Sequence, residues 1–251
     1  MVREYFSEWG QDKWVVEEIF NFQESRYFLD LAAGKGVVCS NTYFLEKYLN
    51  WKGICIEAND KSFEELKENR TCICEHACVD NKRQKVKFTD SSYKSYLGGI
   101  IDKDVDNKAV ENKSFVWKRT VTLEEILEKY NAPNIIDFFS LDIEGAETRV
   151  MKDFPFNKYT FLSMCVERPG KLLRSIFTIN SYLEVGINPL DKLYIHKSLF
   201  KTFCIKKKWR IYYRYNLRNF FKIFKIDRIV YYSRHILEIP DMIRRKLAKF
   251  K

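Results

Sequence analysis

The chain has 251 residues, of which 46% are hydrophobic and 31% charged, so it can bury a core and is neither collagen-like nor wholly disordered. Its net charge of +10 is unevenly distributed, because residues 199–251 hold 16 of the 44 lysines and arginines but only 3 of the 34 acidic residues. The remaining chain is slightly acidic. We therefore expect one main domain, 1–198, followed by a basic tail, 199–251.

Neither a spanning helix nor a secretory leader is predicted, because no stretch of about 18 uncharged apolar residues occurs and residues 1–13 are polar. We expect a cytoplasmic protein, with a peripheral position on a membrane as a further expectation that depends on the tail. Seven cysteines favour buried reduced thiols, and a zinc cluster at Cys72, Cys74 and Cys78 is the alternative.

Strands and helices are expected to alternate through the first half of the chain. Apolar or alternating runs predict strands at 27–31, 53–57, 72–79 and 84–90, and helical spacing predicts helices at about 38–49 and 60–70. Residues 91–114 are rich in Ser, Lys, Asp and Asn, so they are expected to form a long loop or lid.

The same alternation continues in the second half. A capping-box pattern, Thr122 with Glu125, predicts the start of a helix. Strands are expected at 135–142, 160–166 and 191–196, and helices at 144–152 and 171–182. Such an order of apolar strands and helices predicts the α/β class, with a mostly parallel sheet covered by helices on both faces.

Polar residues stand where the first predicted strands end, which is where open α/β sheets bind ligands. Asp30 precedes a turn with Gly34 and Gly36, whose backbone can approach a ligand closely. Glu57 ends the second strand, where a carboxylate can bind both hydroxyls of a ribose, and Asp80 follows the third as a candidate for the adenine edge. Because the third glycine of a dinucleotide fingerprint and the P-loop sequence are both missing, an adenosine ligand without pyrophosphate is favoured.

Carboxylates also follow the later strands. Asp142 and Glu144 are expected on the same side of a strand end, and Glu167 ends the next strand. These three and His196 are candidate general bases, or the carboxylates hold a divalent cation such as Mg²⁺. His196 is otherwise a packed or capping histidine, and Glu147 otherwise begins a helix, where an acidic side chain suits the dipole.

Four segments of the chain match the motifs of a known family. They are FLDLAAGKG (28–36), SNTYFLE (40–46), WKGICIEAN (51–59) and SLDIEGAE (140–147). Together with Gly10–Asp12 they closely resemble the FkbM family of S-adenosylmethionine-dependent methyltransferases, over about residues 5–197. The resemblance implies a Rossmann-like fold with a seven-stranded sheet, and methyl transfer to a hydroxyl, often on a sugar or glycan.

The resemblance also implies which residues contact the cofactor S-adenosylmethionine. It points to Asp30, Gly34 and Glu57, and its motifs add Gln11, Ala32, Gly36, Ser40, Asn41, Ala58 and Asp142. The turn departs from the family pattern at Lys35, where an acidic residue is common.

The tail interleaves aromatic and basic residues from Tyr212 to Phe224, and Pro240 precedes a final basic segment. Two amphipathic helices are expected. Three roles are open for them: binding to an anionic membrane surface, packing on the sheet or on a second subunit, or binding to nucleic acid.

The first functional hypothesis is an O-methyltransferase of a saccharide or glycan, which is lipid-linked if the tail binds a membrane. The second is an RNA-binding protein or an RNA ribose 2′-O-methyltransferase. Such enzymes commonly set Lys, Asp, Lys and Glu at successive strand ends, whereas here Glu167 and Arg168 follow the strand at 160–166. A non-catalytic relative that acts as an interaction protein is the third.

Overall fold

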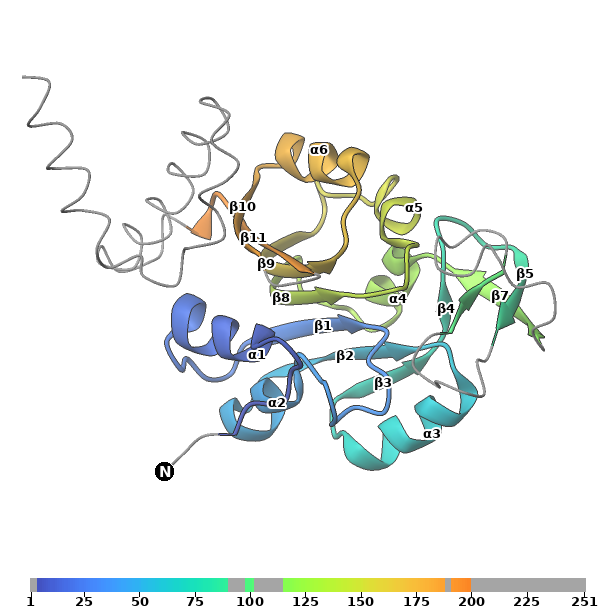
Figure 1. Cartoon of the computed structure of the whole chain (residues 1–251), viewed down its shortest axis with the longest axis horizontal. Coiled ribbons are helices and arrows are strands. Elements are labelled where there is room, and N and C mark those ends of the chain that lie inside the picture. Colours follow the sequence, from blue (N-terminus) through green and yellow to red (C-terminus); the bar gives the residue numbers. More distant parts are fainter. Residues whose placement is uncertain (1–3, 90–97, 102–114, 188–190, 200–251) are drawn as a thin grey trace, which may run out of the picture. The chain divides into compact units, whose positions relative to one another are not determined.

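The computed structural model describes residues 4–89, 98–101, 115–187 and 191–199 (Figure 1). The helical tail expected at 199–251 lies outside the described residues beyond Leu199, as does most of the loop expected at 91–114. Within the described part, no helix is long and apolar enough to cross a membrane.

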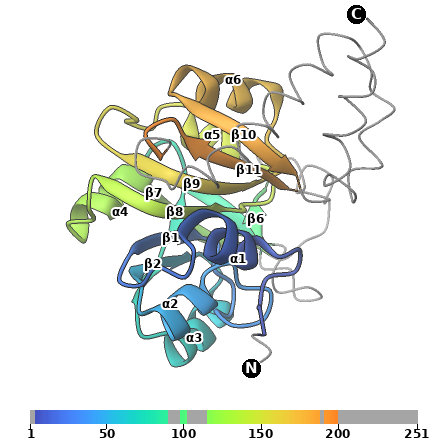
Figure 2. The ribbon, with the colours of Figure 1, turned by 90° about the vertical axis from the view of Figure 1, so that its left-hand side faces the viewer.

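A seven-stranded sheet organises the described chain, with the strand order β10-β11-β9-β8-β1-β2-β3 (Figure 1), and Figure 2 shows the strands from β10 to β2 from another side. The strands are β1 (Tyr27–Leu31), β2 (Lys52–Glu57), β3 (Ile73–His76), β8 (Ile135–Leu141), β9 (Thr160–Glu167), β10 (Tyr182–Ile187) and β11 (Asp191–His196). Neighbours from β3 to β9 run parallel, and β11 is antiparallel to both β9 and β10. The expected α/β fold and mostly parallel sheet are thus confirmed.

The order of the strands reverses at the centre of this sheet. Strand β1 pairs with β2 on one side and with β8 on the other, although β8 follows it by about a hundred residues along the chain. The connections therefore diverge at this point and leave a crevice outside the carboxyl ends of β1 and β8.

Helices cover the sheet on both faces. They are α1 (Gln11–Lys13), the π-helical η1 (Trp14–Phe20), α2 (Tyr43–Leu49), α3 (Asp60–Asn69), α4 (Leu123–Lys129), α5 (Glu147–Met151) and α6 (Lys171–Ile179). Because side chains alternate along a strand, Leu29 and Leu31 pack into one core with α4, α5 and α6, whereas Phe28 and Asp30 point to the face that holds α2. Each face thus has its own apolar support.

The capping box predicted for α4 is present. The hydroxyl of Thr122 accepts a hydrogen bond from the backbone N–H of Glu125 (3.2 Å), and the carboxylate of Glu125 accepts one from the N–H of Thr122 (2.9 Å). Two orphan donors of the first turn are satisfied in this way.

A second, smaller sheet has the order β4-β7-β5-β6, formed by β4 (Cys78–Val79), β5 (Lys85–Thr89), β6 (Gly99–Ile100) and β7 (Phe115–Val121). The single strand expected at 72–79 was wrong, because the chain leaves the main sheet at Ala77 and β4 pairs with β7 instead. Strand β7 was not predicted, because its mostly exposed residues give no alternating apolar pattern.

Three predicted helices are shorter than expected. Helix α2 begins at Tyr43 because the hydroxyl of Ser40 accepts the N–H groups of Thr42 (3.3 Å) and Tyr43 (3.1 Å) and ends the preceding loop there. Helix α5 begins at Glu147 because Glu144 and Gly145 have φ angles of 54° and 96°. Helix α6 ends at Ile179, and the chain then enters β10, which was not predicted.

The loop between β1 and α2 is held by the buried side chain of Arg70. Its guanidinium donates to Glu46 (2.5 Å), to the carbonyl of Gly36 (3.2 Å) and to the hydroxyl of Thr42 (3.1 Å). The Thr42 hydroxyl in turn donates to Asp30 (2.6 Å). One cation therefore connects the end of α3, the loop, α2 and β1.

The two glycines of this loop are expected to respond differently to substitution. A Cβ on Gly36 (φ 86°) would lie 2.7 Å from Cδ1 of Leu66 and 2.9 Å from Cγ of Arg70, so Gly36→Ala should lower the free energy of unfolding by about 2–4 kcal/mol. Around Gly34 (φ 57°) nothing lies within 4 Å, so Gly34→Ala should cost only about 1 kcal/mol. Urea denaturation measures both, and equal losses would contradict the packing described here.

Candidate active site

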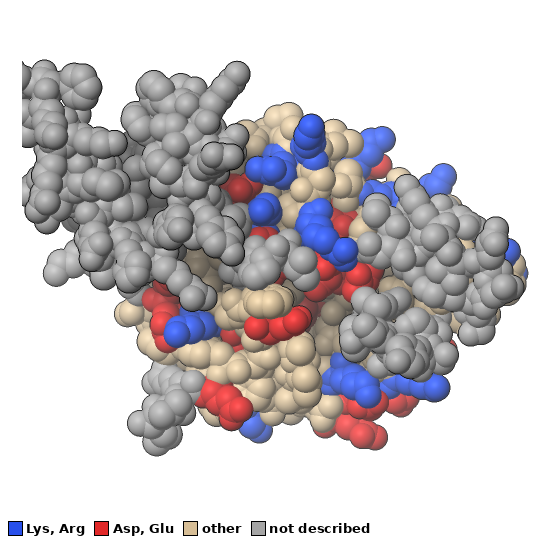
Figure 3. All heavy atoms as spheres, in the orientation of Figure 1, with Lys and Arg blue, Asp and Glu red and all other residues tan. Residues whose placement is uncertain are grey.

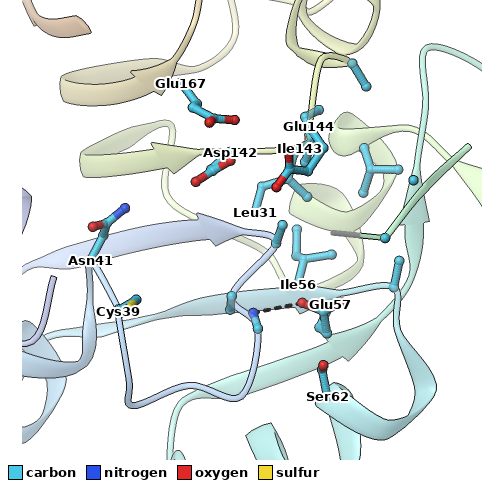
Figure 4. Close-up of a pocket in the computed structure, with 18 of the residues that line it drawn as sticks. Leu31, Cys39, Asn41, Ile56, Glu57, Ser62, Asp142, Ile143, Glu144 and Glu167 are labelled. Atoms are coloured by element: carbon cyan, nitrogen blue, oxygen red, sulfur yellow. Dashed lines mark hydrogen bonds between the residues drawn. The ribbon is translucent and has the colours of Figure 1, made fainter. Parts of the chain in front are cut away.

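A cavity of about 830 Å³ opens at the carboxyl ends of the central strands (Figure 4). Its floor includes Leu31 and Ile56, which end β1 and β2, and Phe88 and Ile100 of the second sheet form part of its wall. This cavity thus lies at the crevice expected from the reversed strand order. In Figure 3 acidic side chains gather near the centre of the face shown, beside lysines and arginines.

Glu57 forms one side of the cavity together with the turn after β1. One oxygen of its carboxylate accepts the N–H of Gly34 (2.8 Å, dashed in Figure 4) and the other accepts the N–H of Asn59 (2.7 Å). Burial raises the pKa of Glu57, and the backbone N–H donors oppose that rise. The backbone N–H of Ala58 is a third donor to this carboxylate, which has about four acceptor positions and can therefore still accept hydroxyl groups of a ribose.

Asn41 carries a buried acceptor with no partner among the described residues. Its side-chain N–H donates to the hydroxyl of Ser140 (2.9 Å), but its Oδ1 accepts no hydrogen bond there. Since buried polar atoms are rarely left unpaired, this oxygen fits a donor on a ligand, such as the ammonium group of an amino acid. Glu57 and Asn41 together fit a molecule with a ribose at one end and an amino acid at the other.

Three carboxylates, of Asp142, Glu144 and Glu167, lie across the cavity from Glu57 (Figure 4). Each offers an oxygen within 4.8 Å of the others, so the expected grouping at the strand ends is present. Burial raises the pKa of Asp142 well above its usual range, and a hydrogen bond and charge from Glu167 and the charges of Glu144 and Asp191 raise it further. The group therefore holds a proton under conditions in which an exposed aspartate would be ionised.

Arg168 partly neutralises this acidic group. Its Nη2 donates to Glu144 (3.1 Å) and to Glu167 (3.1 Å), and its Nε lies 3.0 Å from the other oxygen of Glu167. The residue has a φ of 36°, in the left-handed region, which turns its side chain back toward its neighbour. Arg168 was not predicted as a site residue, although its position directly after a strand-end carboxylate was the available signal.

Gln11 lies at the same end of the cavity. Its side-chain N–H donates to Asp191 (2.5 Å) at the start of β11, and both residues line the cavity. Of the other residues expected around a cofactor, Ala32, Gly34, Asn41, Glu57, Ala58 and Asp142 also line it.

Three expected cofactor residues lie behind the cavity wall. Asp30, Gly36 and Ser40 do not line the cavity, and instead they belong to the network around Arg70 that holds the loop. Their contribution to the cavity is to position the loop.

Asp80 and His196 do not reach the cavity. Asp80 is fully buried between Arg149 (2.6 Å) and Gln84 (2.6 Å), which take both of its oxygens. Since β11 is antiparallel to β9, its first residue, Asp191, lies beside Glu167, and its last, His196, lies at the far edge of the sheet. There its Nδ1 bonds to the hydroxyl of Ser198 (2.7 Å), which corrects its expected role as a general base.

Glu147 begins helix α5, which is the alternative predicted for it from the sequence. One of its oxygens accepts the N–H groups of Ile143 (3.1 Å) and Gly145 (3.1 Å), so it closes the loop that carries Glu144. Burial raises the pKa of Glu147, and these N–H donors oppose the rise.

The cysteines expected to be buried thiols differ in exposure. Cys55, Cys78 and Cys165 are buried, whereas Cys39 is exposed and lines the cavity. The sulfur atoms of Cys55 and Cys72 lie 3.6 Å apart. Within the described ranges, the group with metal-ligand geometry is the carboxylate group of Asp142 and its neighbours.

The sheet order and the position of the cavity define a methyltransferase-like α/β fold, with seven strands flanked by helices. A family model, that of the methyltransferase FkbM domain, matches residues 30–189. The chain belongs to this family, and the enzyme class that follows is a methyltransferase, for which the family implies S-adenosylmethionine as the methyl donor.

Solved structures similar to this chain are also methyltransferases by their descriptions. A human methyltransferase 10 domain containing protein shares 14% identity over 74% of this chain and 79% of its own, with a TM-score of 0.41. The N-terminal domain of human METTL16 shares 14% over 73% and 67%, with a TM-score of 0.39. A methyltransferase from Pyrococcus furiosus shares 14% over 76% and 86%, with a TM-score of 0.36. The comparison with curated proteins found no match.

Replacement of Glu57 tests the ribose end of the cavity. Glu57→Ala is expected to weaken the binding of S-adenosylhomocysteine by about 1–3 kcal/mol, because two hydroxyls would lose a charged acceptor. Isothermal titration calorimetry measures this, with Glu64→Ala on the exposed face of α3 as the control. Unchanged affinity in Glu57→Ala, with the control also unchanged, would contradict the assignment.

The raised pKa of Asp142 predicts a pH-dependent cost to stability. A carboxyl that binds its proton more tightly in the folded chain loses stability as the pH rises above its unfolded pKa of about 3.9. Asp142→Asn removes this ionisation, so the variant should melt at a higher temperature than the wild type near neutral pH, with a difference that shrinks toward the acid side. Thermal denaturation across a pH series measures it. A variant that is less stable at every pH would contradict the prediction.

Proposed function

We propose that this chain is an O-methyltransferase that uses S-adenosylmethionine and methylates a hydroxyl of a saccharide or glycan. The observation that carries the proposal is the half-buried Asp142 carboxyl beside the buried Glu167, which faces the cavity opposite the ribose-binding candidate Glu57. The bound cofactor would supply an electrophilic methyl group on a sulfonium. The chain itself must hold the acceptor in line with that methyl group and take up one proton from its hydroxyl.

The carboxylate group can perform the proton transfer. The pKa of Asp142 is raised, so its ionised carboxylate is a stronger base than that of an exposed aspartate. With the cofactor bound, this carboxylate would take up the proton of the acceptor hydroxyl as the hydroxyl oxygen gains the methyl group, and the electron pair of the broken carbon–sulfur bond would remain on sulfur. Arg168 keeps the neighbouring Glu144 and Glu167 paired throughout, which limits the repulsion that the ionised group must tolerate.

The charge of the cavity supports a saccharide over RNA as the acceptor. Among the residues that the structure describes, its lining includes the carboxylates of Glu8, Glu57, Asp142, Glu144, Glu167 and Asp191, against the cations Lys35 and Arg168. A phosphodiester backbone would be repelled by this excess of negative charge, whereas sugar hydroxyls can donate to carboxylates. The exposed ring of Trp9 at the cavity offers an apolar surface for a sugar ring.

We also propose that the reaction needs no divalent cation. Arg168 already supplies positive charge at two of the three carboxylates, so the group does not require a metal ion to neutralise it.

The tail, 199–251, supports a lipid-linked acceptor, because its excess of basic residues favours an anionic membrane surface. Truncation of the chain after residue 198, followed by a vesicle-binding measurement, tests this role.

A methyl-transfer assay tests the proposal. With labelled S-adenosylmethionine and panels of neutral saccharides, acidic saccharides and RNA oligonucleotides, label should enter a saccharide. Asp142→Asn should lower that turnover by about 10²–10⁴-fold while cofactor binding remains, and Glu64→Gln should leave it unchanged. Activity should persist in EDTA.

Label that enters only RNA would contradict the acceptor assignment. Near-normal turnover in Asp142→Asn would contradict the role of this carboxyl, and loss of activity in EDTA with recovery on added Mg²⁺ would show that the carboxylates hold a cation.

A further inference from the structure

The outer face of the small sheet combines aromatic rings with cations that form no ion pair with a described residue, and the proposed methyl transfer makes no use of it. Phe115 and Trp117 of β7 are 42% and 54% exposed, although both are large apolar side chains. Lys85 and Lys87 of β5 and Arg119 of β7 are exposed too. We name these five side chains the β5–β7 face.

The strand register places the five side chains on one side of the sheet. In the antiparallel pair, Lys87 lies opposite Trp117 and Lys85 opposite Arg119, so their side chains point the same way. The alternate residues Val86 and Phe88 are buried on the other side. Because side chains alternate between the two sides of a pleated sheet, this face is formed by every second residue of β5 and β7.

The lysines lie over the aromatic rings. The ammonium of Lys85 is 4.6 Å from the ring centre of Trp117, and that of Lys87 is 4.8 Å from the ring centre of Phe115. The two rings meet edge to face, with 5.6 Å between their centres. The faces of the rings are thus already partly occupied by cations, while the rings and the ammonium groups remain accessible.

The face has no acidic counterpart in its own strands. Neither β5 nor β7 contains an aspartate or glutamate, and none of Lys85, Lys87 and Arg119 forms an ion pair with a described residue. Its three positive charges therefore complement an anionic surface. Within the described ranges residues 115–119 of β7 also form an edge, because the pairs of β4 with β7 involve Thr120 and Val121.

We propose that the β5–β7 face binds an anionic lipid surface. Tryptophan and phenylalanine side chains are suited to the headgroup level of a bilayer, and each lysine or arginine near an anionic leaflet adds to the attraction. Flat stacking of RNA bases on Trp117 and Phe115 would first have to displace the lysines from their rings, so a lipid surface is the better match. The proposal does not depend on the methyl acceptor.

Lipid binding at this face would bring the cavity close to the membrane. Phe88 of β5 and Ile100 of β6 line the cavity from the same small sheet that presents the β5–β7 face outward. Only the thickness of this sheet separates the two surfaces.

Co-sedimentation of the full chain with vesicles tests the proposal. Lys85→Glu/Lys87→Glu should reduce binding to phosphatidylserine-containing vesicles by at least about tenfold, while the charge-matched control Lys47→Glu/Lys61→Glu should reduce it much less. Trp117→Ala should lower the binding that persists at about 0.5 M salt, where Coulomb attraction is screened, and Ile179→Ser, at the exposed end of α6, should not. Thermal melts confirm that the variants are folded.

The proposal is overturned if Lys85→Glu/Lys87→Glu and its control bind vesicles equally. That is also the result expected if the tail alone accounts for vesicle binding. It is also overturned if the same double variant loses affinity for a single-stranded RNA oligonucleotide and keeps its affinity for vesicles. Binding of S-adenosylhomocysteine, measured in parallel, should be unchanged in all variants and separates this proposal from the proposed enzymatic function.

Discussion

The interaction on which the cavity most depends is the buried charge of Arg70. Its guanidinium donates hydrogen bonds to Gly36 in the loop after β1 and to Glu46 in α2. It also donates to the hydroxyl of Thr42, which in turn donates to Asp30 in the central strand. Leaving any of these buried groups unpaired would cost more than the net gain of a single exposed ion pair. The turn at Gly34, which meets Glu57 in the cavity, is therefore supported from behind by a polar network whose residues do not line the cavity.

The other side of the cavity, opposite Glu57, carries an excess of negative charge. The strand ends of β8 and β9 bring Asp142, Glu144 and Glu167 together because parallel strands all end at one edge. The chain tolerates this through Arg168 and through a raised pKa at Asp142. Stability is given up at the candidate active site, where the proposed function places a proton acceptor, and such a loss is usual for functional sites.

Much of this arrangement could be predicted from the sequence. The strands at β1 and β2 and their terminal residues, such as Glu57, followed from apolar runs that end in polar residues. The position of His196 could not, because its distance from the site depends on β11 being antiparallel, which a six-residue pattern does not encode. Arg168 and the strand β7 were missed for a related reason, since an exposed or ion-paired residue leaves no periodic signal.

A crystal structure of the chain with S-adenosylhomocysteine bound tests the central claim most directly. The account predicts that the ribose hydroxyls bond to Glu57, that the amino group bonds to Oδ1 of Asn41, and that the sulfur atom faces the carboxylates of Asp142 and Glu167. A cofactor that binds outside this cavity, or with its sulfur turned away from Asp142, would contradict the account.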